Sequence, residues 1–291
     1  KNKPDIVLSY TIKPIIYGSL AAYISGINKI FSMVTGIGYA FYGDTLKQKL
    51  IGKLVKKIYK SALHYNAKVF FQNPDDLDYF ISNKLINSKS KTLIINGSGV
   101  DLNYYSFSKP PINRITFLLI ARFLKEKGIF EFIDAAKILK NQYPKTRYQI
   151  IGWRDDGPSG INMSTINNWE KEPFVELLGY KEDVRKYLQK SSVYVLPSYR
   201  EGTPRTVLEA MSTGRPIVTA DSPGCRETVI NNKNGFLVPI RNSKVLAKKM
   251  EKFILEPSLI NKMGKESRKI AELKYDVNKV NNQIINGMGI Y

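Results

Sequence analysis

The sequence lacks the features by which several classes of protein are recognised. Cysteine occurs once in 291 residues, at Cys225, which excludes an internal disulfide framework and favours a reduced, intracellular setting. No run of about 18 uncharged apolar residues is present, because Lys13 and Lys29 interrupt the most apolar stretch, so no segment is predicted to span a bilayer. The chain begins Lys-Asn-Lys-Pro, without a methionine or a signal peptide, and we expect that it starts inside a longer protein.

Acidic residues are scarce. Asp and Glu total 25 against 45 Lys and Arg, a formal net charge of +20, and this excess favours anionic partners such as phosphates, nucleic acid or an acidic membrane surface. The charge does not choose among them, and a composition biased toward Lys, Asn and Ile accounts for it equally well. The 43% of apolar residues suffices for packed cores, which excludes a disordered chain, and the length predicts two domains.

Short apolar runs alternate with amphipathic stretches along the whole chain, a pattern typical of a parallel sheet wound with helices. The predicted strands are Ile6–Ser9, Ile30–Val34, Lys68–Gln72, Thr92–Ile95, Ile115–Ala121, Tyr148–Ile151, Val175–Leu178, Val193–Leu196, Ile217–Thr219 and Gly235–Val238. The predicted helices are Ile15–Ser25, Thr45–Tyr65, Pro74–Asn83, Gly128–Asn141, Asp183–Lys190, Pro204–Thr213 and Arg226–Ile230, with a helical tail from Ser243 to about Asn286.

A break in this alternation predicts the domain boundary. The glycine-rich stretch 96–101 is followed by the loop-like 106–111, which contains two prolines. We therefore expect an α/β protein with a Rossmann-like domain over 1–110, a second one over 111–275, and a C-terminal helix over 276–291 that crosses back to the first. Paired domains of this kind bind ligands in the cleft between them.

The strongest local signal is the stretch 198–210, which follows a predicted strand and opens a helix. Thr203 is a good N-cap and Pro204 suits the first helical position, so a helix N-terminus is predicted that can hold a phosphate or a developing anion. Glu201 lies in the loop, and Glu209 lies in the helix among apolar residues, where a carboxylate needs partners such as the two hydroxyls of a ribose. Two ordinary solvated glutamates beside a helix start are the alternative.

A second signal is the stretch 121–128, at the end of another predicted strand. Arg122 and Lys127 are spaced so that one loop can turn both cations toward a cleft, and an arginine fork with an ammonium suits a diphosphate. Lysines beside a helix start are also common as solvated surface residues, and Lys125 is expected to be one.

Taken together, these stretches resemble the donor half of retaining glycosyltransferases of family 4, which have the GT-B fold. The matching pieces are Arg122, Lys127-Gly128, the pair Glu201 and Glu209, and the stretches 152–156, 178–180 and 214–219. The pieces 120–122, 152–159 and 224–225 look like bacterial N-acetylgalactosaminyltransferases that act on undecaprenyl-diphosphate-linked sugars. The resemblance implies two Rossmann-like domains facing a cleft. We expect the first of them to be incomplete here, without one or two of the family's βα units and without its usual N-terminal glycine-rich loop.

The resemblance also implies roles for individual residues. Arg122 and Lys127 would hold the donor diphosphate and stabilise the leaving group, and Glu201 would contact the transferred sugar. Other residues would bind the rest of the donor: Glu209 at the ribose, Gly202, Thr203, Pro204, Arg205 and Thr206 at the sugar and phosphate, and Leu178, Gly179 and Tyr180 around the base. Gly152 and Val207 are further donor-binding candidates. Acceptor-side candidates are Lys13, Gly36, Gly38 and Tyr39, with Lys13 where many relatives have a histidine. No metal and no cofactor is expected, since the UDP-sugar is a substrate.

The predicted helix 45–65 carries apolar residues at helical spacing and six lysines between them. The simpler interpretation is that it packs on its own sheet with solvated lysines. The alternative is that its basic face, with Lys53, Lys56 and Lys57, binds an anionic membrane surface.

We therefore expect a retaining hexosyltransferase of surface polysaccharide or glycan biosynthesis. It would move a hexosamine (GalNAc or GlcNAc) from a UDP-sugar to a lipid-linked saccharide, in the cytoplasm or peripherally on the inner face of the membrane. One alternative is another GT-B enzyme such as a nucleotide-sugar epimerase, which would lack the Arg122/Lys127 and Glu201/Glu209 combination. A basic nucleic-acid-binding protein is the other. It is suggested by charge alone, and because no zinc-ligand spacing or RNP-like segment accompanies the charge, no nucleic-acid partner is expected.

Overall fold

A computed structural model describes residues 4–37, 46–86 and 91–290, with no side chains at 46–49 and 51. The chain divides into two compact units, of which the first is Lys1–Ser98 with Asn278–Tyr291 and the second is Gly99–Val277. The division falls at residue 98 and not at the predicted 110. Residues 99–110 belong to the second unit because two of its arginines, one buried and one half-buried, bind their backbone. Arg268 donates to the Leu102 carbonyl at 3.1 Å, and Arg215 donates to the Ser108 carbonyl.

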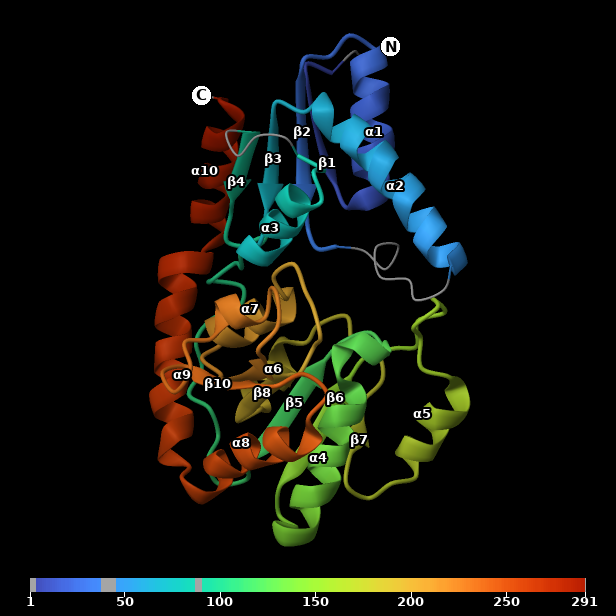
Figure 1. The fold of residues 1–291 in the computed structure, drawn as a ribbon. Helices are drawn as coiled ribbons and strands as arrows, with labels where there is room; N and C mark the ends of the chain where they lie inside the picture. Colours follow the sequence, from blue (N-terminus) through green and yellow to red (C-terminus); the bar gives the residue numbers. More distant parts are fainter. Residues whose placement is uncertain (1–3, 38–45, 87–90, 291) are drawn as a thin grey trace. The chain divides into compact units, whose positions relative to one another are not determined.

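The first unit contains a four-stranded parallel sheet in the order β1 (Ile6–Tyr10), β2 (Lys29–Val34), β3 (Lys68–Phe71) and β4 (Thr92–Ile94). The connecting helices are α1 (Ile12–Ile24), α2 (Leu46–His64) and α3 (Pro74–Ser82). Because the strands follow one another in sequence order and crossovers are right-handed, these helices cover one face of the sheet. The other face is covered by α10 (Val277–Met288), which is the prediction's returning C-terminal helix (Figure 1).

Alternation along the strands builds a core on each face of this sheet. On β3, Val69 and Phe71 pack among α1, α2 and α3, whereas Phe70 packs against Val280 and Ile284 of α10. The strands are therefore apolar on both sides, as expected of a parallel sheet with helices on both faces.

The second unit has a six-stranded parallel sheet in the order β10-β9-β8-β5-β6-β7. Its strands are β5 (Thr116–Ile120), β6 (Arg147–Ile151), β7 (Glu176–Leu177), β8 (Val193–Leu196), β9 (Ile217–Ala220) and β10 (Gly235–Val238). Its helices are α4 (Ile129–Gln142), α5 (Met163–Glu170), α6 (Arg185–Lys190), α7 (Arg205–Ser212), α8 (Ser243–Leu255) and α9 (Ser258–Ile270). The chain runs from β5 outward to β7 and then returns to place β8 on the other side of β5. The pair β5–β8 is therefore the topological switch point, where open α/β sheets bind ligands at the carboxyl ends of the strands.

The helical tail and α5 differ from the prediction. Pro257 ends α8, which interrupts the predicted tail, whereas the extended backbone at Asp276 (φ −55°, ψ 124°), after a π-helical turn over Ala271–Tyr275, agrees with the separate C-terminal helix predicted from 276. The prediction also has no helix at α5, whose sequence is rich in polar residues. This helix is held by an Asn162 side chain that accepts from the Thr165 N–H at 2.9 Å and by two buried residues, Ile166 and Trp169.

Among the described residues, no helix combines the length and the apolar character needed to cross a bilayer.

Candidate functional site

Two glycines bring the loops at the switch point into contact. Gly128 ends the loop after β5 with φ +72°, and a Cβ there would lie 2.2 Å from the Pro197 carbonyl oxygen at the end of β8. Gly224, with φ +80°, lies so close to the β8 loop that a Cβ would approach the Glu201 carbonyl oxygen to 2.3 Å. Only glycine tolerates both conditions, so the sequence permits the loops after β5, β8 and β9 to close on one another.

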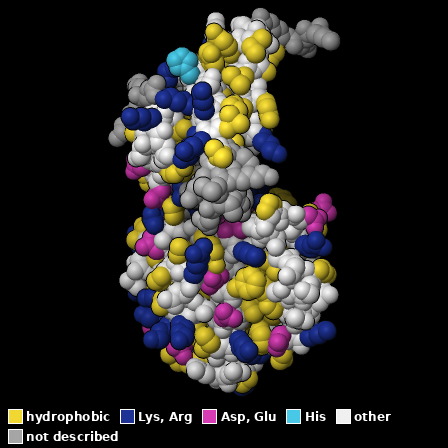
Figure 2. All heavy atoms as spheres, turned by 45° about the vertical axis from the view of Figure 1, so that its right-hand side comes forward, with side chains coloured by type: hydrophobic (Ala, Val, Ile, Leu, Met, Phe, Trp, Pro, Cys, Tyr) yellow, Lys and Arg dark blue, Asp and Glu magenta, His cyan; other side chains and the backbone are white. Residues whose placement is uncertain are grey.

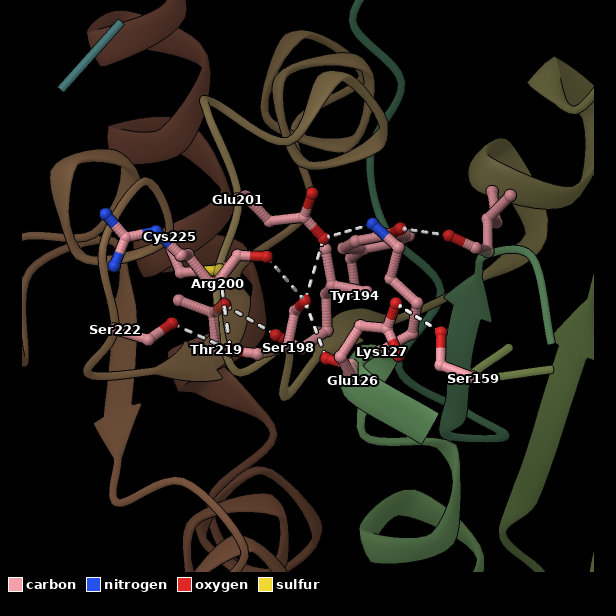
Figure 3. A network of polar contacts seen from close by, with 12 residues as sticks. Glu126, Lys127, Ser159, Tyr194, Ser198, Arg200, Glu201, Thr219, Ser222 and Cys225 are labelled. Carbon is pink, nitrogen blue, oxygen red and sulfur yellow. Dashed lines mark hydrogen bonds and ion pairs between the residues drawn. The ribbon is translucent and has the colours of Figure 1, made fainter. Parts of the chain in front are cut away.

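Lys127 and Glu201 meet at this point. Lys127 ends a 3₁₀ turn over Lys125–Lys127, and its Nζ lies 2.6 Å from the Glu201 Oε1. The Ser198 hydroxyl donates to the same oxygen at 2.8 Å (Figure 3). Side-chain exposures of 18% and 14% show that the pair is largely shielded from water, which strengthens the attraction. Ammonium has three donors, and the ion pair with Glu201 uses one of them.

Arg122 lies two residues beyond the end of β5 and presents its guanidinium to solvent. Its Nη1 lies 2.6 Å from the Asp155 Oδ2, and half of its side chain is exposed. The pKa of Asp155 is lowered, first by the Gly157 N–H that it accepts and then by Arg122. Asp155 therefore stays ionised and orients the guanidinium, whose remaining N–H groups are suited to an anion.

Glu209 is a buried carboxylate on α7. It accepts from Arg205 Nε at 3.1 Å, one turn earlier, and from the hydroxyl of Tyr105. Burial raises the pKa of Glu209, while the hydrogen bonds from Tyr105 and Arg205 act in the opposite direction. The sequence predicts that the buried Glu209 carboxylate needs hydrogen-bond partners, and Arg205 and Tyr105 supply part of them. Tyr105, 104 residues away in the chain, carries no local signal that could have identified it.

Tyr194 of β8 is fully buried, and the charges of both carboxylates act on it. Its hydroxyl lies 3.2 Å from the Ile120 carbonyl oxygen at the end of β5. Burial chiefly raises the pKa of Tyr194, and the charges of Glu209 and Glu201 add to the effect. Glu201 and Glu209 follow β8 in its loop and helix, so they belong to the same carboxyl edge of the sheet as the β5 loop that carries Lys127.

The helix that carries Glu209 starts one residue later than predicted. It begins at Arg205, with Pro204 (ψ 109°) in the cap position, so Thr203 is not the N-cap. Pro204 has no side-chain acceptor, and the first N–H groups of α7 have no acceptor within the helix. These N–H groups, from Arg205 and Thr206, point out of the N-terminus, where anions are favoured.

The donor-binding candidate Gly152 follows β6, and the predicted base-binding residues Leu178, Gly179 and Tyr180 follow β7. Gly152 approaches the β5 loop so closely that a Cβ would lie 2.0 Å from the Ala121 carbonyl oxygen, and its N–H donates to the Gly179 carbonyl at 3.1 Å. Tyr180 is 61% exposed and stands edge-to-face with Trp153 at 5.2 Å. The two rings form an exposed aromatic pair. Tyr180 is one of the predicted site residues, and Trp153 is not. Leu178 is half-buried and packs against the core cluster that contains Ile151 of β6.

Two further residues from the family-like stretches have structural surroundings. Arg215 is fully buried and donates to the carbonyls of Ser191 (2.8 Å) and Ser108, and burial lowers its pKa to about 10. Cys225 is buried behind the Ser198 carbonyl, and burial, with the charge of Glu201, raises the pKa of its thiol to about 12. A thiol with so high a pKa is unreactive at neutral pH.

The acceptor-side candidates belong to the first unit. Lys13 is exposed in the first turn of α1, directly after β1, and Gly36 (φ +131°) follows β2. Because β1 and β2 are neighbours, both lie at the carboxyl edge of that sheet. Gly38 and Tyr39 lie outside the described residues. Within 4–37, 46–86 and 91–290, no group of three or more His, Cys, Asp or Glu is arranged to hold a metal ion.

Comparison with protein families matches residues 106–270 to glycosyl transferases group 1. Of characterised proteins, the N,N'-diacetylbacillosaminyl-diphospho-undecaprenol alpha-1,3-N-acetylgalactosaminyltransferase of Campylobacter jejuni is 28% identical, over 94% of this chain and 74% of its own length. The UDP-Gal:alpha-D-GlcNAc-diphosphoundecaprenol alpha-1,3-galactosyltransferase of Escherichia coli is 26% identical, over 100% of this chain and 73% of its own length.

Solved structures share the arrangement of helices and strands. Anabaena Alr3699/HepE, crystallised with UDP, has a TM-score of 0.81 at 20% identity, covering 97% of this chain and 78% of that one. Sucrose-phosphate synthase from Thermosynechococcus elongatus also has a TM-score of 0.81 at 20% identity, covering 96% of this chain and 72% of its own. These likenesses establish the GT-B fold.

Proposed function

Because the chain belongs to the glycosyl transferases of group 1, we propose that it moves a hexosamine from a UDP-sugar to a lipid-linked saccharide with retention of anomeric configuration. The observation that carries this proposal is the convergence of Lys127 and Glu201, 2.6 Å apart, at the switch point of the second unit. Arg122 lies two residues after β5, and Glu209 lies in α7, the helix that follows β8. The name of the Campylobacter relative supports a hexosamine as the sugar and an undecaprenyl diphosphate as the acceptor's carrier.

The two cations would hold the diphosphate of the donor. When the sugar–phosphate bond breaks, negative charge builds up on the leaving diphosphate, and donors that are already in place lower the energy of that state. Lys127 and Arg122 keep free N–H groups after pairing with Glu201 and Asp155. The open N–H groups of α7 add a favourable dipole at the same edge. These donors serve the leaving group, so we propose a reaction without a metal or other cofactor.

The two carboxylates would bind hydroxyl groups. Glu201 would accept from the transferred sugar, because it lies beside the ammonium that would hold the neighbouring phosphate. Glu209 would accept from the ribose, since an ionised carboxylate accepts only and the 2′- and 3′-hydroxyls are a matched pair of donors. Tyr180 and Trp153 would contact the base at the outer end of the site.

The decisive experiment is isothermal titration calorimetry with UDP, GDP and their hexosamine derivatives. It is followed by transfer from the bound donor to a polyprenyl-diphosphate saccharide, with the anomer of the product read by NMR. We expect UDP to bind, and Lys127→Ala to weaken that binding about tenfold or more, since it removes one charge-assisted contact. Lys125→Ala is the matched control, an exposed lysine of the same 3₁₀ turn. If no nucleotide binds, or if the two variants behave alike, the proposal is wrong.

We further propose that α2 rests on an anionic membrane surface, where a lipid-linked acceptor is found. Leu50, Leu54 and Ile58 repeat along one side of α2 and are 67%, 60% and 39% exposed. Figure 2 shows hydrophobic side chains gathered over this part of the first unit, with basic ones at the edges. Such a division of a helix into an exposed apolar side and a lysine side is typical of helices that lie in the membrane interface.

The structure changes which lysines carry this second proposal. Lys53 and Lys57 are exposed beside the apolar side. Lys56 is half-buried, donates to the Asn83 amide oxygen at 2.8 Å and lies over the Tyr79 ring, so it is withdrawn from the proposed face.

Liposome co-sedimentation tests the membrane contact. Lys53→Glu with Lys57→Glu should abolish binding to phosphatidylglycerol vesicles, because each lysine contributes about 1 kcal/mol near such a surface. Lys244→Glu with Lys248→Glu is the control, since it reverses the same charges at the same spacing on α8 of the second unit. Equal binding by both double variants, or binding unchanged at high salt, would remove the membrane contact and leave sugar transfer untouched.

A further inference from the structure

A cavity of about 430 Å³ lies at the C-terminal end of α2, in the first unit. Its floor is apolar and comes from three elements: Leu63 of α2, Val69 of β3, and Leu85 and Ile86 after α3 are all buried. Its volume is within the range of sites that bind small molecules. The cavity is therefore large enough for a ligand and has the apolar surface to hold a hydrocarbon portion of one.

The rim of the cavity is basic. Lys57 and Lys60 of α2 and Lys91 before β4 line it together with His64, and none of the described lining residues is Asp or Glu. Within the described part of the chain, Lys57 and Lys60 make no hydrogen bond or ion pair, and Lys91 makes one long hydrogen bond, 3.4 Å to the His64 carbonyl oxygen. Like charges gathered without a counter-charge repel one another, so an anion in their midst is stabilised.

The cavity is remote from the edge of the sheet at which chemistry is expected. It lies at the amino ends of β3 and β4, since Val69, the second residue of β3, and Lys91, just before β4, line it. Ligands of open α/β sheets bind at the carboxyl ends, where Lys13 and Gly36 lie. The cavity is thus a separate site and not an extension of the acceptor-side region.

We propose that this cavity binds the phosphate headgroup of an anionic lipid, with the lysines around the phosphate and the beginning of the hydrocarbon chain on the apolar floor. Lysine is a common point-charge ligand of phosphate. A lipid is favoured over a free anion because phosphate alone would contact only the basic rim and would leave the apolar floor of the cavity without a partner. The cavity is also continuous with the exposed side of α2 through Lys57. The inference deepens the proposed membrane contact by making it headgroup-specific, and it does not depend on sugar transfer.

Calorimetry with dodecyl phosphate below its micelle concentration tests the proposal on the intact chain. Dodecyl phosphate should bind, and both inorganic phosphate and dodecyl maltoside should bind at least tenfold more weakly. The double variant Lys60→Glu with Lys91→Glu should bind dodecyl phosphate at least tenfold more weakly than the parent. The control double variant, Lys244→Glu with Lys248→Glu, should bind it as tightly as the parent. Circular dichroism of each variant verifies that it is folded.

Three outcomes would overturn the assignment. Equal binding by the two double variants would show that the cavity lysines are not used. If inorganic phosphate bound as tightly as dodecyl phosphate, the cavity would be an anion site that does not recognise lipid. If dodecyl maltoside bound as tightly, the cavity would recognise only the apolar chain. Lys53, which does not line the cavity, separates the two membrane proposals, since Lys53→Glu should weaken vesicle binding and leave dodecyl phosphate binding unchanged.

Discussion

Replacing Glu209 by glutamine should weaken UDP binding without reducing stability. The side chain is buried on α7 and keeps its shape in the variant, but the amide has one acceptor oxygen where the carboxylate has two and a charge. Hydrogen bonds to a charged group contribute about 1.5–3 kcal/mol each, so the loss of one corresponds to about 10- to 100-fold weaker binding.

The direction of the stability change follows from linkage. Burial raises the pKa of Glu209 above its ordinary value of 4.5, so the folded state binds the proton more tightly than the unfolded state does. Ionisation of Glu209 therefore reduces stability as the pH rises from 4.5 through the raised pKa, and above that pH the cost is complete. Glutamine stands in for the protonated form and avoids that cost. The melting temperature of Glu209→Gln at pH 7 should be equal to or higher than that of the parent.

Calorimetry with UDP and 2′-deoxy-UDP completes a double-mutant cycle for this contact. The parent should prefer UDP, and Glu209→Gln should lose most of that preference. Glu172→Gln, an exposed acid of the same unit, is the control. An unchanged UDP affinity, or an unchanged preference for the 2′-hydroxyl, would refute the ribose contact. A lowered melting temperature would refute the account of how burial acts on Glu209.

Two further predictions concern the surroundings of the site. Tyr105→Phe removes a hydrogen bond that lowers the pKa of Glu209. As the pH is lowered, the variant should therefore lose its affinity for UDP at a higher pH than the parent does. Identical profiles of UDP affinity against pH, between pH 4 and pH 8, would contradict this. Gly128→Ala combines a left-handed φ of +72° with a Cβ 2.2 Å from the Pro197 carbonyl oxygen, and it should destabilise the chain more than Gly179→Ala, where φ is +68° and nothing lies within 4 Å. Gly179→Ala should lower the free energy of unfolding, measured in urea, by about 1–2 kcal/mol. If Gly128→Ala lowered it by no more than that, the close approach of the loops would be unimportant for stability.

Most strands could be predicted because each is a short apolar run between turn-forming residues, and in a parallel sheet that signal is local. Helix ends were harder to locate. Pro204 could occupy the first helical position or the cap, and only the backbone conformation (ψ 109°) decides for the cap. The short helix α5 was missed because two buried side chains in eight residues give almost no periodic signal.

The sequence by itself determined the chemistry that is available: Arg122, Lys127, Glu201 and Glu209, each just after a strand or within the first turns of a helix, with glycines where the backbone must come close. Tertiary structure alone decided which of these groups meet, because β8 inserts beside β5 out of sequence order and brings Lys127 to Glu201 across 74 residues. The same packing selected Tyr105 as the partner of Glu209, turned Lys56 away from the exposed face of α2 and enclosed an apolar floor beneath Lys57, Lys60 and Lys91. Spacing along a chain constrains only neighbours in sequence, whereas contacts between loops are set by the order in which strands pair.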